Sequence, residues 1–264
     1  EWTEPTLLSR MDLGHYQITA HSADGKRTAT VFNLHPKPKG LNARTNLYYL
    51  ETSDMGRTWK TAAGAAIQPP LRDTASPALV HDYKAEGQLV YLKSVEFDRQ
   101  GHPVILYLNS KGYESGPAHG LRQWRTARWT GAQWEIRDVA TSDHNYDHGS
   151  LSIDADGSWR IIAATATGPQ PWTTGGDIVL WQSHDQGKTW KSKQLTRSRN
   201  VNHTYPKKPI NAHPDFFAIW ADGDTLKPSD STIYFTDRQG SGVWMLPVTM
   251  TGPSAKPVRI KPGS

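Results

Sequence analysis

The chain has 264 residues, and its 22 Gly and 18 Pro are too frequent for helices of ordinary length, which excludes a mostly helical fold. The 11 Trp, 10 Tyr and 5 Phe supply large rings for a core built of strands. The net charge of +5 favours an anionic partner, but no run of five or more Lys or Arg occurs, so we expect no nucleic-acid partner.

Short apolar and alternating segments predict paired strands around polar turns along the whole chain. In chain order, the predicted strands are 15–21, 27–34, 89–97, 103–108, 123–129, 134–139, 150–153, 159–165, 205–210, 216–220, 232–236 and 244–248. No apolar run approaches the length of a membrane helix, so we expect no membrane span.

Two segments, 52–60 and 183–191, nearly repeat each other and share the pattern Ser/Thr-x-Asp-x-Gly-x-Thr-Trp. Each follows an apolar run, at 47–50 or 178–181. The pattern predicts a hairpin turn in which Asp accepts turn amides, Gly takes a positive φ and Trp packs back under the sheet. A degraded copy occupies 236–244. These repeats indicate a repeat architecture.

The turns inside the first hairpin of each unit are centred near positions 24.5, 99.5, 155.5 and 213. Their regular spacing predicts an all-β fold, a β-propeller of four-stranded antiparallel blades, with about four blades in a single domain over 1–264. Residues 1–5 read as the outer strand of a preceding blade, which predicts a piece of a larger propeller, for example a seven-bladed one. A closed four-bladed propeller is the alternative.

The two boxes resemble the Asp-box, or BNR, repeat of sialidase-like propellers. The segments 14–18, 40–46, 142–146 and 202–205 resemble bacterial BNR-4 repeat proteins, so that the resemblance covers nearly the whole chain. Within that group the chain is similar to the propellers of ulvan lyases and rhamnose-glucuronate lyases, whose site holds two histidines near an inner hairpin with a Tyr and an Arg.

This resemblance implies that His15 and His35, which flank one such hairpin, are the histidine pair. Tyr83 and Arg99 have a plausible spacing for the other two groups, but Arg99 lies in a turn that should face the opposite side. Sialidases need an Arg-Ile-Pro segment near the start of the chain. None occurs here, which argues against sialic acid as substrate.

Blade geometry sorts the remaining candidates, because the start of the first strand and the end of the second lie on one face of a propeller. The residues expected on this face as catalytic groups are His15, His35, Arg44 and Tyr205, and those expected to bind substrate are Tyr113, His119, Tyr146, His148 and Lys207. His203 is expected beside Tyr205. The structural alternative for each is a solvated loop residue or a side chain packed on a neighbouring blade.

These residue types favour β-elimination over hydrolysis. A glycosidase presents two carboxylates that flank the bond, and no obvious pair occurs on this face. A lyase that acts on a uronate needs a cation beside the carboxylate, a base and an acid, which His, Tyr and Arg supply. No residue cluster has the spacing of a catalytic metal site, so we expect no cofactor, although a structural Ca²⁺ on loop carboxylates is compatible with the sequence.

We therefore predict a carbohydrate-active propeller, a polysaccharide lyase that cleaves uronate-containing acidic glycans, with His15 and His35 as the acid and base and with Arg44 and Tyr205 on the carboxylate. Its partners would be an acidic polysaccharide or oligosaccharide and the remaining blades of a larger propeller. A glycoside hydrolase, rhamnosidase-like or sialidase-like, and a glycan-binding propeller without catalysis are the alternatives. The chain has no Cys, which is compatible with the secreted or periplasmic location that we expect.

Overall fold

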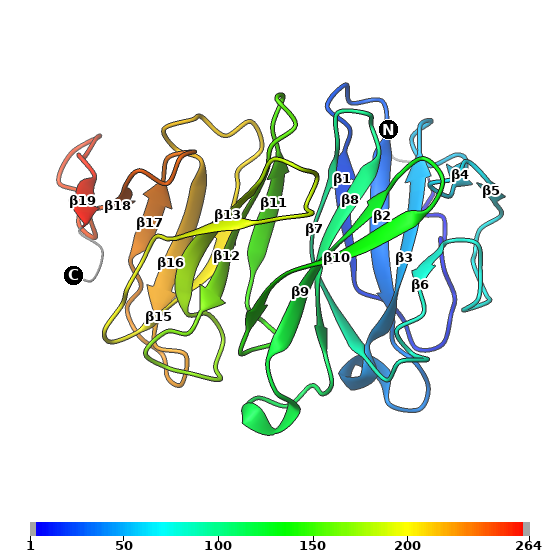
Figure 1. Ribbon diagram of the computed structural model, residues 1–264, viewed down its shortest axis with the longest axis horizontal. Coiled ribbons are helices and arrows are strands. Elements are labelled where there is room, and N and C mark those ends of the chain that lie inside the picture. The colour runs from blue at the N-terminus through cyan, green and yellow to red at the C-terminus, as the bar shows by residue number, and fades with distance from the viewer. Residues whose placement is uncertain (1–3, 261–264) are drawn as a thin grey trace. The chain divides into compact units, whose positions relative to one another are not determined.

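The computed structural model describes residues 4–260 as four antiparallel β-sheets with two short 3-10 helices, η1 (Gly40–Ala43) and η2 (Pro117–His119) (Figure 1). The chain divides into two compact units. Unit 1 comprises residues 1–113 and 125–138, and unit 2 comprises residues 114–124 and 139–264. No helix among the described residues is long and apolar enough to span a membrane.

Unit 1 holds the first sheet and most residues of the second. The first sheet has six strands: β1 (Gln17–His21), β2 (Thr28–Leu34), β3 (Thr45–Thr52), β4 (Trp59–Lys60) and β5 (Ala66–Ile67) in that spatial order, with β6 (Leu79–His81) paired to β3. The second sheet has the order β10 (Trp134–Ser142), β9 (Arg122–Trp129), β8 (Pro103–Ser110) and β7 (Leu89–Phe97).

Unit 2 holds the third and fourth sheets. The third contains β11 (Gly149–Ile153), β12 (Trp159–Ala166), β13 (Asp177–Ser183) and β14 (Lys191–Gln194). The fourth contains β15 (Asn202–Lys207), β16 (Ala218–Gly223), β17 (Ile233–Thr236), β18 (Val243–Met245) and β19 (Val258–Ile260). These meandering antiparallel sheets confirm the predicted all-β class and its four repeating units.

Burial explains why these segments form strands. The strands β3 and β8 are buried along their whole length and consist mainly of aliphatic and aromatic residues, whereas β1 alternates between exposed and partly buried positions. In unit 1 the core contains Val31, Tyr49, Val90 and Tyr107. In unit 2 a separate core contains Ile162, Leu180, Phe217, Ala218 and Trp220. Each unit therefore has its own buried apolar centre.

The Asp-box hairpins form as predicted. The carboxylate of Asp54 accepts the Thr58 backbone N–H at 2.9 Å and the Thr58 hydroxyl at 2.6 Å, and Asp185 accepts the same two groups of Thr189 at the same distances. Gly56 has φ +85°. Hydrogen bonds from the Thr58 side chain and backbone stabilise the ionised carboxylate and lower the pKa of Asp54 to about 2.

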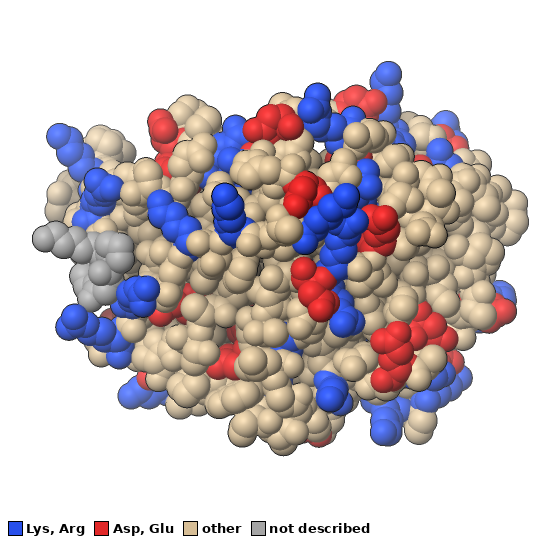
Figure 2. Space-filling model, in the orientation of Figure 1, with Lys and Arg blue, Asp and Glu red and all other residues tan. Residues whose placement is uncertain are grey.

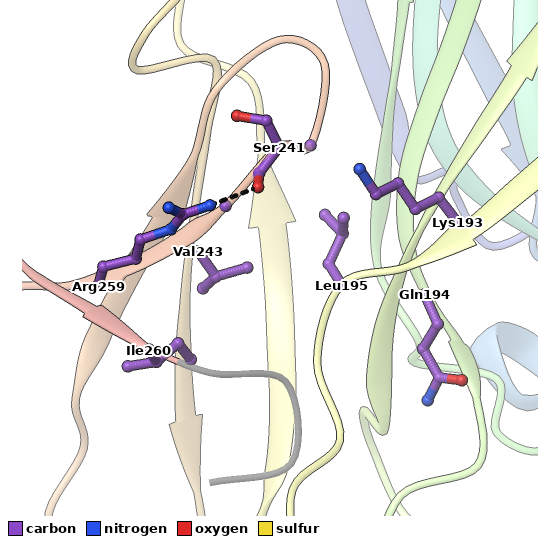
Figure 3. Close-up of a pocket in the computed structure, with 9 residues that line it drawn as sticks. Lys193, Gln194, Leu195, Ser241, Val243, Arg259 and Ile260 are labelled. Atoms are coloured by element: carbon purple, nitrogen blue, oxygen red, sulfur yellow. Dashed lines mark hydrogen bonds between the residues drawn. The ribbon is translucent and has the colours of Figure 1, made fainter.

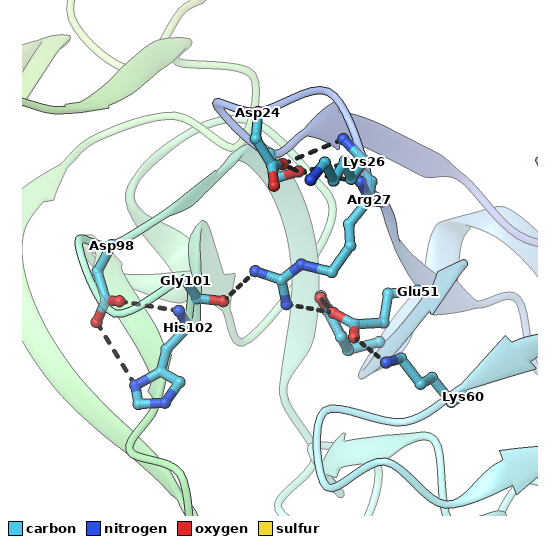
Figure 4. Close-up of polar contacts among 10 residues, drawn as sticks. Asp24, Lys26, Arg27, Glu51, Lys60, Asp98, Gly101 and His102 are labelled. Atoms are coloured by element: carbon cyan, nitrogen blue, oxygen red, sulfur yellow. Dashed lines mark hydrogen bonds and ion pairs between the residues drawn. The ribbon is translucent and has the colours of Figure 1, made fainter. Parts of the chain in front are cut away.

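Polar contacts join turns of the two sheets within unit 1 (Figure 4). The Arg27 guanidinium lies 3.3 Å from the Glu51 carboxylate and donates to the Gly101 carbonyl oxygen at 2.7 Å. Gly101 has φ +77°, which favours glycine, and a Cβ atom there would lie 2.6 Å from Nη2 of Arg27 and would displace the guanidinium. On the other side of Glu51, Lys60 forms an ion pair at 3.3 Å.

Several predicted strands are displaced in the fourth sheet. The first runs over 202–207 rather than 205–210, and the second over 218–223 rather than 216–220. The sequence favoured the wrong start because Asn202 and His203 are polar, yet both are buried. The short strands β5, β6 and β19 were not predicted, because segments of two or three residues have no periodicity.

Two further predictions concern the box tryptophans and residues 1–5. The box residues Trp59 and Trp190 are only partly buried, because they lie at the outer side of their sheets, where Nε1 of Trp59 donates to the Gly56 carbonyl oxygen at 3.2 Å. The outer strand predicted at 1–5 lies partly outside the described residues. Its last two residues, Glu4 and Pro5, form no strand.

Candidate functional site

The histidines predicted as a pair lie at one end of the β1–β2 hairpin in unit 1. His15 precedes β1 and His35 follows β2, and antiparallel pairing brings these two ends together. The backbone N–H of His35 donates to the Gly14 carbonyl oxygen at 2.9 Å, which fixes the two segments side by side. The structure therefore brings together the two residues that the resemblance implied.

The hydrogen bonds of His15 define its tautomer. Nδ1 lies 2.7 Å from the Asn33 carbonyl oxygen, and because a carbonyl only accepts, Nδ1 carries the proton. Nε2 lies 2.9 Å from the Ser9 hydroxyl and accepts from it in the neutral ring. Burial lowers the pKa of His15, although the bond to Asn33 opposes this. His15 is thus held neutral with both nitrogens engaged.

His35 differs from His15 in having a ring nitrogen that is available. The residue is 8% exposed, and its Nε2 atom is buried without a hydrogen-bond partner among residues 4–260. Burial lowers the pKa of His35, and the charges of Arg44 and His15 lower it further. The ring of Tyr16, which is 48% exposed, contacts the His35 ring edge-on at 4.8 Å between centroids. Nε2 of His35 therefore has an unused hydrogen-bonding site, which a ligand reaches only when the side chains that cover it move aside.

Arg44 supplies a positive charge beside this pair. Its guanidinium carbon lies 4.9 Å from the ring centre of Tyr16 and 4.6 Å from that of Tyr91, and its Nε donates to the Leu41 carbonyl oxygen at 2.9 Å. The short helix η1 ends just before Arg44, which places the side chain at the entry to β3. These contacts hold a buried guanidinium in a defined position next to His35.

Two residues of β7, Tyr91 and Lys93, extend the group and were not predicted. The Lys93 ammonium lies 5.9 Å from the Tyr91 ring centre, and Lys93 is 5% exposed. A register shift between Leu92 and Ser94 interrupts the β7–β8 ladder at this point. The sequence signal was a lysine near the middle of a mainly apolar strand, where a lysine needs a reason to be buried.

Unit 2 contains a second group of predicted residues. The rings of His148 and Tyr205 lie 4.1 Å apart between centroids, and the Lys207 ammonium lies 5.0 Å from the centre of the Tyr205 ring. Burial lowers the pKa of Lys207. His203, by contrast, is 4% exposed and packs in the core, where its Nδ1 accepts from the Trp220 indole N–H at 3.2 Å. A catalytic role for Tyr205 stays a prediction.

A buried polar network in unit 2 fixes the loops at 111–121 and 166–177. The Asp147 carboxylate accepts the backbone N–H groups of His144 at 3.0 Å and Gly175 at 2.8 Å. Nε2 of His144 lies 2.9 Å from the Ser115 hydroxyl. Arg122, fully buried, donates to several carbonyl oxygens of the first loop. These groups determine the shape of the loops.

The other predicted binding residues lie on or beside these loops. Tyr146 is 42% exposed and its ring lies 5.8 Å from that of His144. Nε2 of His119 lies 2.8 Å from the Glu114 carboxylate, and Tyr113 is 46% exposed. Their binding roles stay predictions. Tyr83 is fully buried and its hydroxyl lies 2.6 Å from that of Tyr107, which makes it a core residue rather than a surface group.

Two cavities of unit 2 have none of the predicted site residues in their lining. One, of about 400 Å³, has an apolar floor of Leu195, Val243 and Ile260, with Lys193 and Arg259 beside it (Figure 3). Another, of about 790 Å³, is lined by Phe235 and Trp244 among others. Across the face shown in Figure 2, basic and acidic side chains are interspersed rather than gathered into one block of either sign.

Among residues 4–260, no cluster of three or more His, Cys, Asp or Glu side chains could hold a metal ion. The histidine group of unit 1 therefore consists of imidazole, phenol, hydroxyl, ammonium and guanidinium groups. This set can bind an anion and move a proton.

Comparison with solved structures supports the fold. The chain is similar to a family 25 polysaccharide lyase, an ulvan lyase, with a TM-score of 0.67 and 18% identity over 84% of this chain and 51% of that one. The same lyase has been solved bound to -[GlcA(1-4)Rha3S]-. The polysaccharide lyase Uly1 gives a TM-score of 0.52 with 14% identity, over 84% of this chain and 45% of that one.

A protein of unknown function from Dyadobacter fermentans gives a TM-score of 0.50 with 14% identity, over 84% of this chain and 60% of that one. The chain thus spans about half the length of the ulvan lyase that it matches. No curated protein sequence matches it. Residues 15–142, which include both histidines and Arg44, match the family described as BNR repeat-containing family member.

Proposed function

We propose that the protein is a carbohydrate-active enzyme of the polysaccharide lyase kind, which cleaves an acidic glycan at a uronate by β-elimination. The observation that carries the proposal is the buried Nε2 atom of His35, which has no partner among the described residues and lies in a group that also holds the Arg44 guanidinium. A free base next to a fixed cation is what abstraction of a proton α to a carboxylate requires.

In the proposed reaction, Nε2 of His35 removes the C5 proton of the uronate. The electron pair of that C–H bond forms the C4–C5 double bond, and the C4–O4 bond breaks with its electrons leaving on O4. Negative charge develops on the carboxylate during proton removal, and the Arg44 guanidinium offsets it. Because the pKa of His35 is lowered, its ring is neutral near pH 7 and ready to accept the proton.

The leaving oxygen must gain a proton. His15 was predicted for this role, but its Nδ1 proton is directed to the Asn33 carbonyl and its Nε2 accepts from Ser9. The exposed phenol of Tyr16, whose ring contacts both His35 and the Arg44 guanidinium, is better suited to donate. We therefore assign His15 to positioning the hairpin end and Tyr16 to proton donation. A hydrolase would need two carboxylates, which this group does not supply.

The test is to incubate the protein with uronate polymers and to follow the ultraviolet absorbance of the new double bond conjugated to the carboxylate. We expect turnover by the wild type, none by His35→Asn, and strongly reduced turnover by Tyr16→Phe. His21→Asn is the matched control, because His21 is an exposed histidine of the same hairpin. Release of reducing ends without absorbance would select the hydrolase, and binding without any cleavage would select the glycan-binding alternative.

A further inference from the structure

Tyr205 adopts a backbone conformation that is unusual for its residue type. Its φ is +58°, in the left-handed region where a bulky side chain is disfavoured. It lies where the β15–β16 register shifts between Thr204 and Lys207, so the chain bulges at this point. Such an outlier persists only where surrounding contacts enforce it, and it often marks a functional position.

Contacts with the third sheet hold this bulge in place. The Ser150 hydroxyl in β11 donates to the Pro206 carbonyl oxygen at 3.2 Å and accepts the Lys208 backbone N–H at 3.3 Å. Both bonds attach the bulge to a neighbouring strand of unit 2. The bulge is therefore held by one buried and one partly buried hydrogen bond to the Ser150 hydroxyl.

The bulge directs the side chain of Tyr205 outward. Tyr205 is 52% exposed, although the next residue, Pro206, is buried and the preceding residue, Thr204, is partly buried. A half-exposed tyrosine gains less from burial than a core residue does, so burial alone is a weak reason for a large side chain in strained backbone. Its ring lies against the imidazole of His148, and the Lys207 ammonium is close to the ring face.

We propose that Tyr205, His148 and Lys207 form a binding subsite of unit 2 for a saccharide ring that carries an acidic substituent. The exposed Tyr205 ring offers a flat apolar surface for the C–H groups of a pyranose, and Lys207 offers a cation for a carboxylate or sulfate. In this assignment Tyr205 binds rather than reacts. The assignment deepens the proposed function, because it supplies the acidic glycan with a second point of attachment, but the binding itself does not depend on catalysis.

The test measures binding of an oligosaccharide of alternating glucuronate and rhamnose 3-sulfate to the His35→Asn variant by isothermal titration calorimetry. In that background we expect Tyr205→Asn to weaken binding about tenfold, because the stacking surface is lost, whereas Tyr205→Phe binds within about twofold. Asparagine tolerates positive φ, so Tyr205→Asn should also unfold at the same or a higher temperature. Loss of binding together with a lower midpoint would indicate a structural role and overturn the proposal.

The charge requirement is tested with Lys207→Gln and its neighbour control Lys208→Gln. We expect Lys207→Gln to weaken binding of the acidic oligosaccharide about tenfold but not binding of its carboxyl-reduced, desulfated form. Derivatives that lack only the sulfate or only the carboxylate identify the group that Lys207 contacts. Wild-type affinity in both Tyr205→Asn and Lys207→Gln, or no binding by the parent protein, would overturn the subsite. Absence of turnover with intact binding would overturn the lyase alone.

Discussion

The buried carboxylate of Glu51 offers a sharp test of how polar groups stabilise unit 1. Glu51 is 5% exposed and accepts the Tyr49 hydroxyl at 2.7 Å, while Arg27 and Lys60 each lie 3.3 Å away (Figure 4). Tyr49 is 1% exposed, so its hydroxyl has no access to water. The cations are more exposed than Glu51 and can be rehydrated when it is removed.

Two substitutions separate these contributions. Glu51→Gln keeps an acceptor for the Tyr49 hydroxyl and loses only two partly exposed ion pairs, which we expect to cost about 1 kcal/mol. Glu51→Ala also leaves the Tyr49 hydroxyl buried without a partner, which adds roughly 1–3 kcal/mol, for a total of about 2–4 kcal/mol. In Tyr49→Phe/Glu51→Ala no hydroxyl is stranded, so the double variant should be more stable than the sum of the two single effects predicts.

The assay is urea unfolding followed by tryptophan fluorescence and by circular dichroism. Trp134 reports locally, because its ring lies 5.5 Å from that of Tyr49. Coincidence of the two transitions is needed before free energies are compared, since the chain has two compact units. Equal stability of Glu51→Gln and Glu51→Ala, or strict additivity in the double variant, would refute the reasoning about the stranded hydroxyl.

Three further predictions follow from charges at named sites. Burial and the Arg44 charge lower the pKa of His35, so its imidazole should titrate below the usual histidine pKa of 6.5. Arg44→Gln should raise the His35 pKa in an NMR titration. An unchanged His35 pKa in that variant would show that Arg44 is not part of the site. The stability that ionised Asp54 gives the first Asp-box should be fully present above the unfolded-state pKa of Asp54 and should be lost as the pH falls through about 2. In Thr58→Val the NMR resonance of the Asp54 carboxyl should titrate at a higher pH than in the wild type, because the Thr58 hydroxyl no longer donates to it. Identical titration in the wild type and the variant would contradict the turn geometry. Arg44→Lys should lower kcat/KM at least tenfold although charge is kept, because an ammonium cannot reproduce the planar stacking on Tyr16 and Tyr91, and full activity would refute that geometry.

Local chemistry made much of the fold predictable. The strand at 89–97 was predicted with correct bounds, because apolar residues end at Asp98 and a tight turn closes at Gly101. The Asp-box turns were also predicted correctly, because the Asp and Thr that form each turn are only four residues apart. By contrast, β15 was misplaced, because Asn202 gains its burial from side-chain hydrogen bonds to the distant residue Gln170, and no local pattern reveals such a partner.

The candidate site was predictable where it depends on a single hairpin. His15 and His35 flank two adjacent antiparallel strands, so their proximity follows from the turn alone. Tyr91 and Lys93 belong to another sheet, and only tertiary packing brings Tyr91 to Arg44, with Lys93 beside Tyr91. The placement of Tyr205 and His148 on the same propeller face as the histidine pair stays a prediction. The contact of Tyr205 with His148 within unit 2 is observed.

The central claim is that His35 acts as the base in a β-elimination. The most direct measurement is the product formed from a uronate polymer by wild type and His35→Asn, analysed by mass spectrometry for an unsaturated terminal uronate. We predict that wild type forms this product and that His35→Asn, folded and still binding the polymer, does not. Saturated products, or unsaturated product at the wild-type rate from His35→Asn, would contradict the claim.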